Sequence, residues 1–399
     1  MADSITVQQD IAASPDLVYR HFTNGTLLRE WLADVATLRA EEGGRLHLAW
    51  NDGYGMVGNF MVLVPGKKVA FTWIGSSPDP VTTEVTVSLE AAGAGTTIGV
   101  EHTMPPGADD DLRAAMTKDW ERSLENLASV METGEDLRFT RRPMLGVMVD
   151  AEVNPERAKK HNIPVDHGVI LGGTVEGMGA AAAGLAGGDA VVQIGETPIN
   201  GFSSFSVALE PLRAGDTVDV VYYRDGEEHT TAMTLSGRPI PEIPATAAAL
   251  SAHVRELYDW VDAELAEIFE GVDDMTASKK PEPGEWSAKE VLAHHLDGEG
   301  DYHSYIIELV QGAERMNDGP FDNSDLRTRI TAESYGSPEE MLAAYRHLEG
   351  QTVAIIAALP DDFVARKGSW WRLAYGYTQA RPHYEEHFAQ IRAALEAAG

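Results

Sequence analysis

The chain has 399 residues, more than a single hydrophobic core usually serves, so its length alone suggests two or three domains. It carries 63 acidic and 31 basic residues, and a formal charge of −32 at pH 7 repels nucleic acid and anionic membranes, so we expect neither as a partner. We interpret this acidity as a solubilising surface, not a cation-binding one, because it is spread along the chain. The absence of cysteine excludes disulfides and cysteine-type zinc sites. Because the chain also lacks a secretory pattern and a membrane-spanning apolar stretch, we expect a cytoplasmic protein.

The first segment reads as a strand, a short helix, several strands and a long helix. Ser14 and Pro15 begin the short helix, and strands are predicted at 45–50, 59–64, 68–73, 81–89 and 98–102. Apolar residues recur at helical spacing from Leu112 to Met131, and Gly134 ends that helix. This order resembles the SRPBCC or START-like helix-grip superfamily, and the ending DWERSLENLASVMETG is similar to the branch named after activators of the heat-shock-protein ATPase. The resemblance implies a curved antiparallel sheet wrapped on a C-terminal helix, over residues 1–137.

Helix-grip relatives often hold a small apolar ligand between sheet and helix, and the resemblance implies the same here. A tryptophan-rich core without a cavity is the alternative explanation of the same residues. The candidate ligand-cavity residues are Trp31, Trp50, Tyr54, Trp73, His102 and Trp120.

The second segment, residues 141–239, consists of short strands, glycine turns and one brief helix. Gly187-Gly188-Asp189 predicts a tight turn before a strand at 191–194, and Arg224-Asp225-Gly226 predicts a hairpin. The run AAAAGLAGGDAVVQIGETPI resembles the PDZ domain of the bacterial HtrA type. The resemblance implies a β-rich, partly open barrel. The run GMGAAA at 177–182 also fits a dinucleotide fingerprint, but the chain turns again too soon for a crossover helix.

The PDZ resemblance implies a groove for the C-terminus of a peptide or protein. The loop at 144–147 would hold the peptide carboxylate through backbone N–H groups, and the strand after it would pair with the peptide. Occupation of the groove by another part of the same chain is the alternative. The peptide-binding candidates are Met144, Leu145, Gly146, Val147, Val149, Phe205 and Leu209, with Phe202 beside the pocket.

The third segment, residues 246–399, contains only amphipathic helices after the proline-punctuated stretch RPIPEIPATAA. One apolar stripe runs from Leu250 to Ile268, Ser287 and Glu290 form a capping box for a second helix, and Ser337-Pro338 opens a third. A fourth helix is expected from about Pro382 to Leu395. These lengths predict an all-α four-helix bundle, so the whole chain is a multidomain α+β protein. Few apolar residues lie near Arg138–Arg142 and 238–244, and we therefore expect three cores that fold separately.

His383 and His387 lie four residues apart, so their imidazoles project from the same face of the last helix. One more ligand from a neighbouring helix would complete a three-histidine site with an open position. The motifs WSAKEVLAHHLDGE at 286–299 and HYEEHFAQI at 383–391 resemble the DinB and YfiT-like bundle family. The resemblance implies His294 as the third ligand. The apolar stripe by itself favours His295, and solvated, capping histidines are the alternative explanation.

A three-histidine site suits a divalent transition metal, with zinc or nickel first and iron as a further option. Asp297 and Glu299 follow on the same helix as candidate bases. The string H-x-x-E-H, with Glu386 as base, needs a further ligand well downstream, and only twelve residues remain. The sequence therefore predicts a metal-dependent hydrolase or thiol S-transferase that also carries a peptide-binding and an apolar-ligand-binding module. The alternative is a non-catalytic scaffold or sensor.

Overall fold

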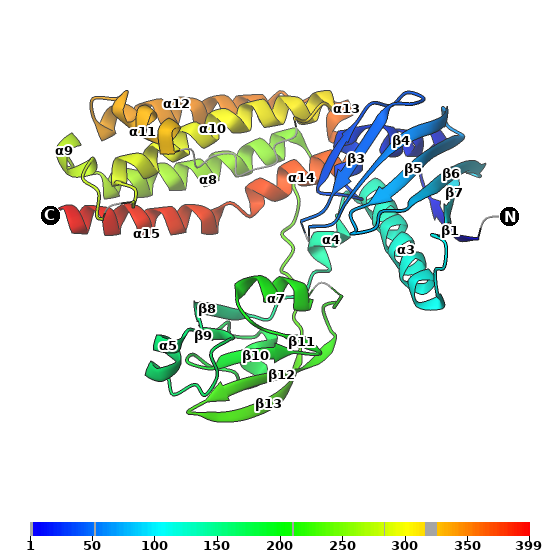
Figure 1. The fold of residues 1–399 in the computed structure, drawn as a ribbon. Coiled ribbons are helices and arrows are strands. Elements are labelled where there is room, and N and C mark those ends of the chain that lie inside the picture. The colour runs from blue at the N-terminus through cyan, green and yellow to red at the C-terminus, as the bar shows by residue number, and fades with distance from the viewer. Residues whose placement is uncertain (1–2, 52, 210, 283, 316–324) are drawn as a thin grey trace. The chain divides into compact units, whose positions relative to one another are not determined.

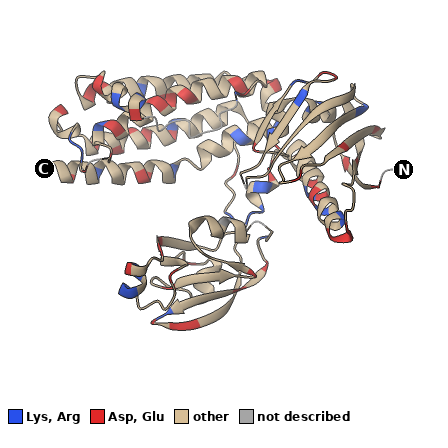
Figure 2. Cartoon of the chain, in the orientation of Figure 1, with Lys and Arg blue, Asp and Glu red and all other residues tan. Residues whose placement is uncertain are grey.

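The computed structural model describes residues 3–51, 53–209, 211–282, 284–315 and 325–399, in two compact units. One unit contains residues up to 135 together with 241–399, and the other contains 136–240. Residues 3–135 are called the sheet domain, 136–240 the central domain and 241–399 the bundle. Acidic residues are spread over all three (Figure 2). Among the described residues, no helix combines the length and the apolar character needed to cross a membrane.

A seven-stranded antiparallel sheet builds the sheet domain (Figure 1). Its strands follow the order β1-β7-β6-β5-β4-β3-β2, and the helix α3 packs on β1, as the helix-grip resemblance implies. Ser14 accepts a hydrogen bond from the N–H of Leu17 and so caps the first helix, as predicted. The elements are β1 (Ser4–Ile11), α1 (Pro15–Thr23), α2 (Gly25–Arg29), β2 (Val35–Leu38), β3 (Arg45–Ala49), β4 (Gly55–Val64), β5 (Lys68–Gly75), β6 (Thr82–Ala92), β7 (Gly95–Thr103) and α3 (Asp110–Glu132).

The central domain is an open sheet with the strand order β13-β12-β10-β9-β8 and with β11 beside β10. The predicted hairpin turn is confirmed, since Asp225 and Gly226 both adopt positive φ angles, 54° and 87°. The edge position of β8 leaves one side of that strand for an added strand. The elements are α4 (Leu137–Thr140), β8 (Val147–Glu152), α5 (Pro155–Lys160), β9 (Val169–Thr174), α6 (Gly179–Ala182), β10 (Ala190–Ile194), β11 (Thr197–Pro198), α7 (Phe202–Leu209), β12 (Thr217–Arg224) and β13 (Glu227–Thr234).

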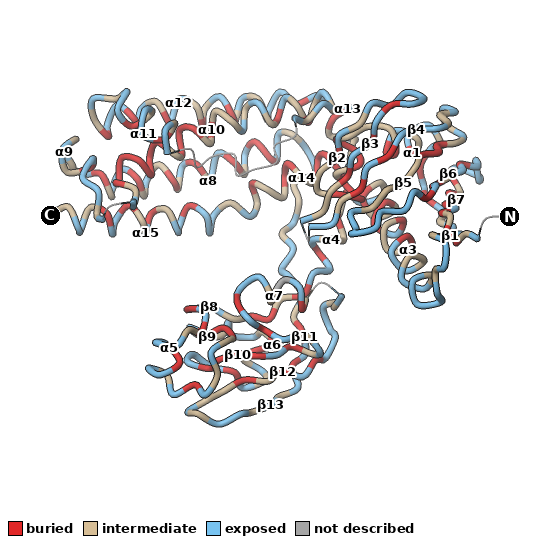
Figure 3. The backbone as a smooth tube through the Cα atoms, in the orientation of Figure 1, coloured by how far each residue is buried: buried red, intermediate tan, exposed pale blue. Residues whose placement is uncertain are grey.

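Four long helices, α8, α10, α12 and α15, run side by side in the bundle (Figure 1). Their buried positions face one shared core, and α10 is buried over most of its first half (Figure 3). The capping box of Ser287 and Glu290 is confirmed, and it begins α10 where the sequence predicts. The elements are α8 (Ala247–Ile268), α9 (Asp274–Ala277), α10 (Ala288–Gln311), α11 (Asp325–Glu333), α12 (Pro338–Ala357), α13 (Asp361–Val364), α14 (Lys367–Thr378) and α15 (Arg381–Ala398).

The sheet domain and the bundle lie in the same compact unit, because α14 contacts α3. The polar connecting segments predict three cores that fold separately, whereas this contact joins two of them. The sequence pattern predicts neither α14 nor its position. Among the described residues, no side chain caps the N-terminus of α14, and its buried residues are apolar like those of the bundle helices around it, so nothing in the sequence marks it as a separate helix. The domain boundaries at 137, 141, 239 and 246 stay predictions.

Candidate functional site

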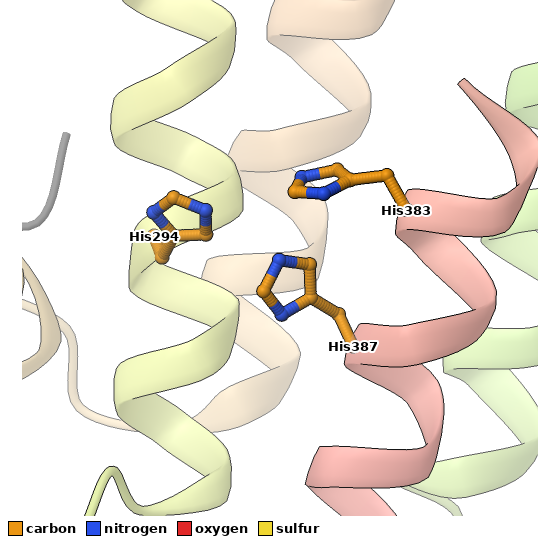
Figure 4. Close-up of side chains that lie close together, drawn as sticks. All are labelled: His294, His383 and His387. Carbon is orange, nitrogen blue, oxygen red and sulfur yellow. The ribbon is translucent and has the colours of Figure 1, made fainter. Parts of the chain in front are cut away.

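Three histidines from two helices of the bundle converge on one point (Figure 4). His294 comes from α10, and His383 and His387 come from α15. One ring nitrogen from each lies within 4.8 Å of the other two. The rings of His383 and His387 stand at 90° with centroids 4.4 Å apart, and those of His294 and His387 are 5.1 Å apart. The structure thus brings together the three residues predicted as metal ligands.

This donor set fits a transition metal. A tetrahedral zinc ion with Zn–N bonds of about 2.0–2.1 Å holds nitrogen pairs roughly 3.3 Å apart. The ring nitrogens here lie within 4.8 Å of one another, and His383 is exposed while His387 is half-buried, so binding of such an ion would require their side chains to rotate inward. Three neutral imidazoles would leave at least one coordination position open.

Neighbouring side chains orient two of the three rings. Trp286 packs its ring 5.3 Å from that of His294, which explains why a tryptophan precedes this histidine by two turns. Nδ1 of His387 lies 3.0 Å from Oε1 of Gln390. An amide oxygen only accepts, so Nδ1 carries the proton and Nε2 keeps its lone pair for a metal.

His295 occupies the neighbouring position and faces the core instead. It is 6% exposed and stacks on Tyr384 at 5.4 Å with the rings nearly parallel. Burial, together with the nearby His387 and His294, lowers its pKa well below the usual value. Helical periodicity correctly indicates that His295 lies inside the bundle, where it contacts Tyr384 and His387 of α15. The family spacing indicates His294, whose ring nitrogen lies within 4.8 Å of those of His383 and His387.

The central domain carries an apolar pocket beside the edge strand β8. Leu145, Val147 and Phe205 line it together with core residues of β10, β12 and β13, and the space among these side chains has no room for a water molecule. Leu209 also packs on this core, whereas Val149 and Phe202 are 43% and 48% exposed. Gly146 has a φ of 74°, and a Cβ there would collide with the side chain of Met178. The predicted carboxylate loop thus depends on a glycine.

Three comparisons with protein families cover most of the chain. Residues 12–132 match the family described as "Activator of Hsp90 ATPase homolog 1-like protein". Residues 143–235 match the PDZ domain, and residues 257–391 match the DinB superfamily. The chain therefore joins three known domain families. The sheet domain is AHSA1-like, the central domain is a PDZ domain, and the bundle is DinB-like.

Individual relatives cover one domain each. The serine protease Do-like HtrA of Lactococcus lactis is 35% identical over 99 residues, which is 24% of either chain. The activator of 90 kDa heat shock protein ATPase homolog 1 of Mus musculus is 36% identical over 69 residues, 17% of this chain and 20% of that one. The chain thus spans about a quarter or less of these curated relatives.

Solved structures resemble one third of the chain. A Mesorhizobium loti protein matches at 22% identity and TM-score 0.30, and the Aha1 dimer from Colwellia psychrerythraea matches at 24% identity and TM-score 0.29. Each match covers 32% of this chain and 96% of the other.

In the AHSA1-like domain, five of the six predicted ligand-cavity residues form one aromatic cluster. Trp73 contacts Trp50, His102 and Trp120, and Tyr54 contacts Trp50. Trp31 is 1% exposed and lies against Phe22. Tyr54 is 40% exposed, so the cluster extends from the core to the surface. A small apolar ligand at this cluster stays a prediction.

His102 is fixed in one neutral form within this cluster. Trp120 donates its Nε1–H to Nδ1 of His102 at 3.1 Å, so Nδ1 must be the unprotonated nitrogen. Nε2 then donates to Oγ1 of Thr83, 2.9 Å away, and Thr83 donates onward to the carbonyl of Trp73. Burial lowers the pKa of His102 to about 4. All its hydrogen-bonding groups are satisfied, which is the arrangement of a structural histidine.

The two candidate bases on α10 of the DinB-like bundle point in different directions. Oδ1 of Asp297 accepts from Thr331 at 2.8 Å, and its Oδ2 is buried without a hydrogen-bond partner among the described residues. Glu299 accepts from Tyr258 at 2.8 Å and from Thr352, so it is fixed toward α8 and α12. Asp297 also forms an ion pair with Arg327, whose Nε lies 3.4 Å from its Oδ1.

Sequence reasoning missed a second buried carboxyl group near Glu299. Glu349 on α12 is 1% exposed, and its carboxyl group lies beside that of Asp262, to which it can donate a hydrogen bond when protonated. Burial, with Asp262 and Glu299 nearby, raises its pKa to about 9, so it carries its proton at neutral pH. The available signal is a glutamate at helical spacing from the apolar residues Met341, Leu342 and Tyr345.

Proposed function

We propose that the DinB-like bundle binds one divalent transition metal through His294, His383 and His387. The convergence of their nitrogens within 4.8 Å carries this proposal. It is supported by the Gln390 contact, which favours the neutral tautomer of His387 that carries its hydrogen on Nδ1 and offers Nε2 to a metal. Neutral imidazole favours zinc or nickel, with iron as a further option, and the chain offers no cysteine that would select a softer ion.

A metal in such a site lowers the pKa of water or of a thiol at its open position and so supplies a nucleophile for hydrolysis or S-transfer. The residues of the chain do the rest. Gln390 orients His387, and Trp286 packs beside His294. The buried Oδ2 of Asp297, one helical turn from His294, is the group we assign to accept a proton.

Cobalt substitution tests this proposal and separates it from a non-catalytic scaffold. Cobalt should bind once per chain and give the visible absorption of a four- or five-coordinate ion, which a small thiol should change by entering the open position. His295→Ala should keep the spectrum, since that ring faces the core, and His294→Ala should lose it. A cobalt spectrum that no thiol or water exchange alters would indicate a closed site and a scaffold or sensor.

We also propose that the PDZ domain binds the free C-terminus of a peptide or protein. The edge position of β8 and the match to the PDZ domain support this function, and the apolar side chains beside β8 would have to move apart to admit a peptide side chain. Peptides with a free C-terminus should bind more tightly than their amidated copies. Equal binding of both forms would mean that the loop at 144–147 does not hold a carboxylate, and occupation of the groove by the chain itself would then explain its shape.

We place the protein in the cytoplasm, as the absence of cysteine favours.

A further inference from the structure

The AHSA1-like domain and the DinB-like bundle meet at a close backbone contact. A Cβ on Gly368 of α14 would lie 2.7 Å from Cγ1 of Val130 on α3 and would collide with the carboxylate of Glu30. A Cβ on Gly134 would lie 3.0 Å from Cβ of Trp371. Neither position has room for a side chain, so both sides of this contact are shaped for each other.

Charged side chains connect the two domains beside this contact. Arg372 of α14 donates two parallel hydrogen bonds of 3.0 Å to the carboxylate of Glu314. Arg29 of α2 forms an ion pair with the same carboxylate. The backbone N–H of Glu314 also donates a hydrogen bond to Oγ1 of Thr26 in the AHSA1-like domain. One carboxylate thus serves two guanidinium groups, one from each domain.

A cavity of about 560 Å³ opens at this point. Its lining contains four arginines and three carboxylates, so it carries an excess positive charge in a chain whose net charge is −32. The volume falls within the usual range of small-molecule sites. Residues from both domains contribute, among them Arg29, Asp301, Tyr305, Glu314, Arg327 and Arg372.

We propose that this cavity binds a small anionic ligand with carboxylate or phosphate groups, and that both domains are needed to bind it. Guanidinium groups match the paired oxygens of such anions and form strong charge-assisted hydrogen bonds. Two of the five N–H groups of Arg372 bond Glu314, and among the described residues no other acceptor is bonded to this guanidinium group. The hydroxyl groups of Ser304 and Tyr305 add neutral donors to the same lining.

The anion site is separate from the histidine cluster, although both lie along one face of α10. His294 and Asp301 are seven residues apart, which is about 10 Å along a helix. Arg327 donates hydrogen bonds of 2.6 and 3.2 Å to the carboxylate of Asp301 and a further one to the backbone carbonyl of Asp297. Anion binding therefore requires none of the proposed metal ligands.

Titration calorimetry of the full chain with inorganic phosphate and with malonate tests this site at constant ionic strength. Either anion should bind once per chain, and a preference between them identifies the phosphate or the carboxylate class. The same titrations in a His383→Ala background should give unchanged affinity. Affinity that disappears in that background would assign the anion to a metal ion and overturn the proposed cavity site.

Substitutions in the lining locate the bound anion. Ser304 is exposed, so Ser304→Glu should fold normally while placing a negative charge in the cavity, and it should weaken binding at least about tenfold. Ser304→Gln is the matched neutral control and should bind as the unmodified chain does. Arg29→Gln should also weaken binding, unlike Arg39→Gln, which changes an exposed arginine of the same domain paired with Glu41. Absence of binding by both anions, or equal binding by Ser304→Glu and Ser304→Gln, would overturn the proposal.

Discussion

Replacing Glu349 by glutamine should change how the stability of the bundle depends on pH. The carboxyl group is almost fully buried, and its pKa is raised from 4.5 to about 9 by burial, Asp262 and Glu299. Between these values the folded chain holds a proton that the unfolded chain releases. Folding therefore becomes less favourable as pH rises through this window, by about 1.4 kcal/mol per pH unit. The glutamine side chain is the neutral, similarly shaped equivalent of the protonated acid, so the variant should lack this dependence.

The comparison at two pH values gives the expected magnitude. From pH 5.5 to pH 7.5, the variant should gain about 3 kcal/mol in unfolding free energy relative to the unmodified chain. Urea denaturation followed by circular dichroism at 222 nm, where the helices dominate, measures this difference. Glu339→Gln, an exposed change on the same helix, is the matched control for the substitution itself. Parallel stabilities of unmodified chain and Glu349→Gln across this pH range would show that Glu349 is ionised in the folded state and would refute the reasoning.

Three further predictions concern the other domains. Proteolysis in the two connections to the PDZ domain should release it while the other two fragments co-elute on size exclusion, because Glu314 of the bundle bonds Arg29 and Thr26 of the AHSA1-like domain; separate elution would contradict this. Gly146→Ala should weaken binding of C-terminal peptides, because its added Cβ would collide with Met178. Gly177→Ala, at a glycine with a similar φ but open space around it, should not weaken binding. Equal affinities of the two variants in a peptide titration would exclude a role for the loop at 144–147. Trp120→Phe leaves the buried Nδ1 of His102 without a donor and should lower the free energy of unfolding by about 1–3 kcal/mol. Unchanged stability in chemical denaturation would show that this hydrogen bond contributes little.

Sequence patterns predicted the fold well where local chemistry sets the geometry. The capping box at Ser287 and the turn at Asp225-Gly226 each satisfy backbone requirements within a few residues, so they can be read without a structure. The histidine pair is equally local, since four residues complete about one helical turn. The choice between His294 and His295 is not local, because both contact α15 and only the packing of the whole bundle decides which ring nitrogen joins those of His383 and His387.

The contact between the AHSA1-like domain and the bundle could not be predicted from the sequence. Arg29 and Arg372 are 343 residues apart, and polar residues at a domain surface look the same whether they meet solvent or a partner. Gly134 was read as a helix terminator, which it is, yet its lack of a side chain also admits the backbone of α14. Glu349 was missed for a related reason, since a single glutamate on a helix is usually exposed.

Elemental analysis of protein purified without chelator and without a histidine tag tests the central claim most directly. The three-histidine site predicts one equivalent of a transition metal, zinc or nickel first, in the unmodified chain and in His295→Ala. It predicts loss of that metal in His294→Ala, His383→Ala and His387→Ala, because two imidazoles hold a divalent ion too weakly. Metal-free unmodified protein that takes up no zinc or nickel, or full metal content in His383→Ala, would contradict the account.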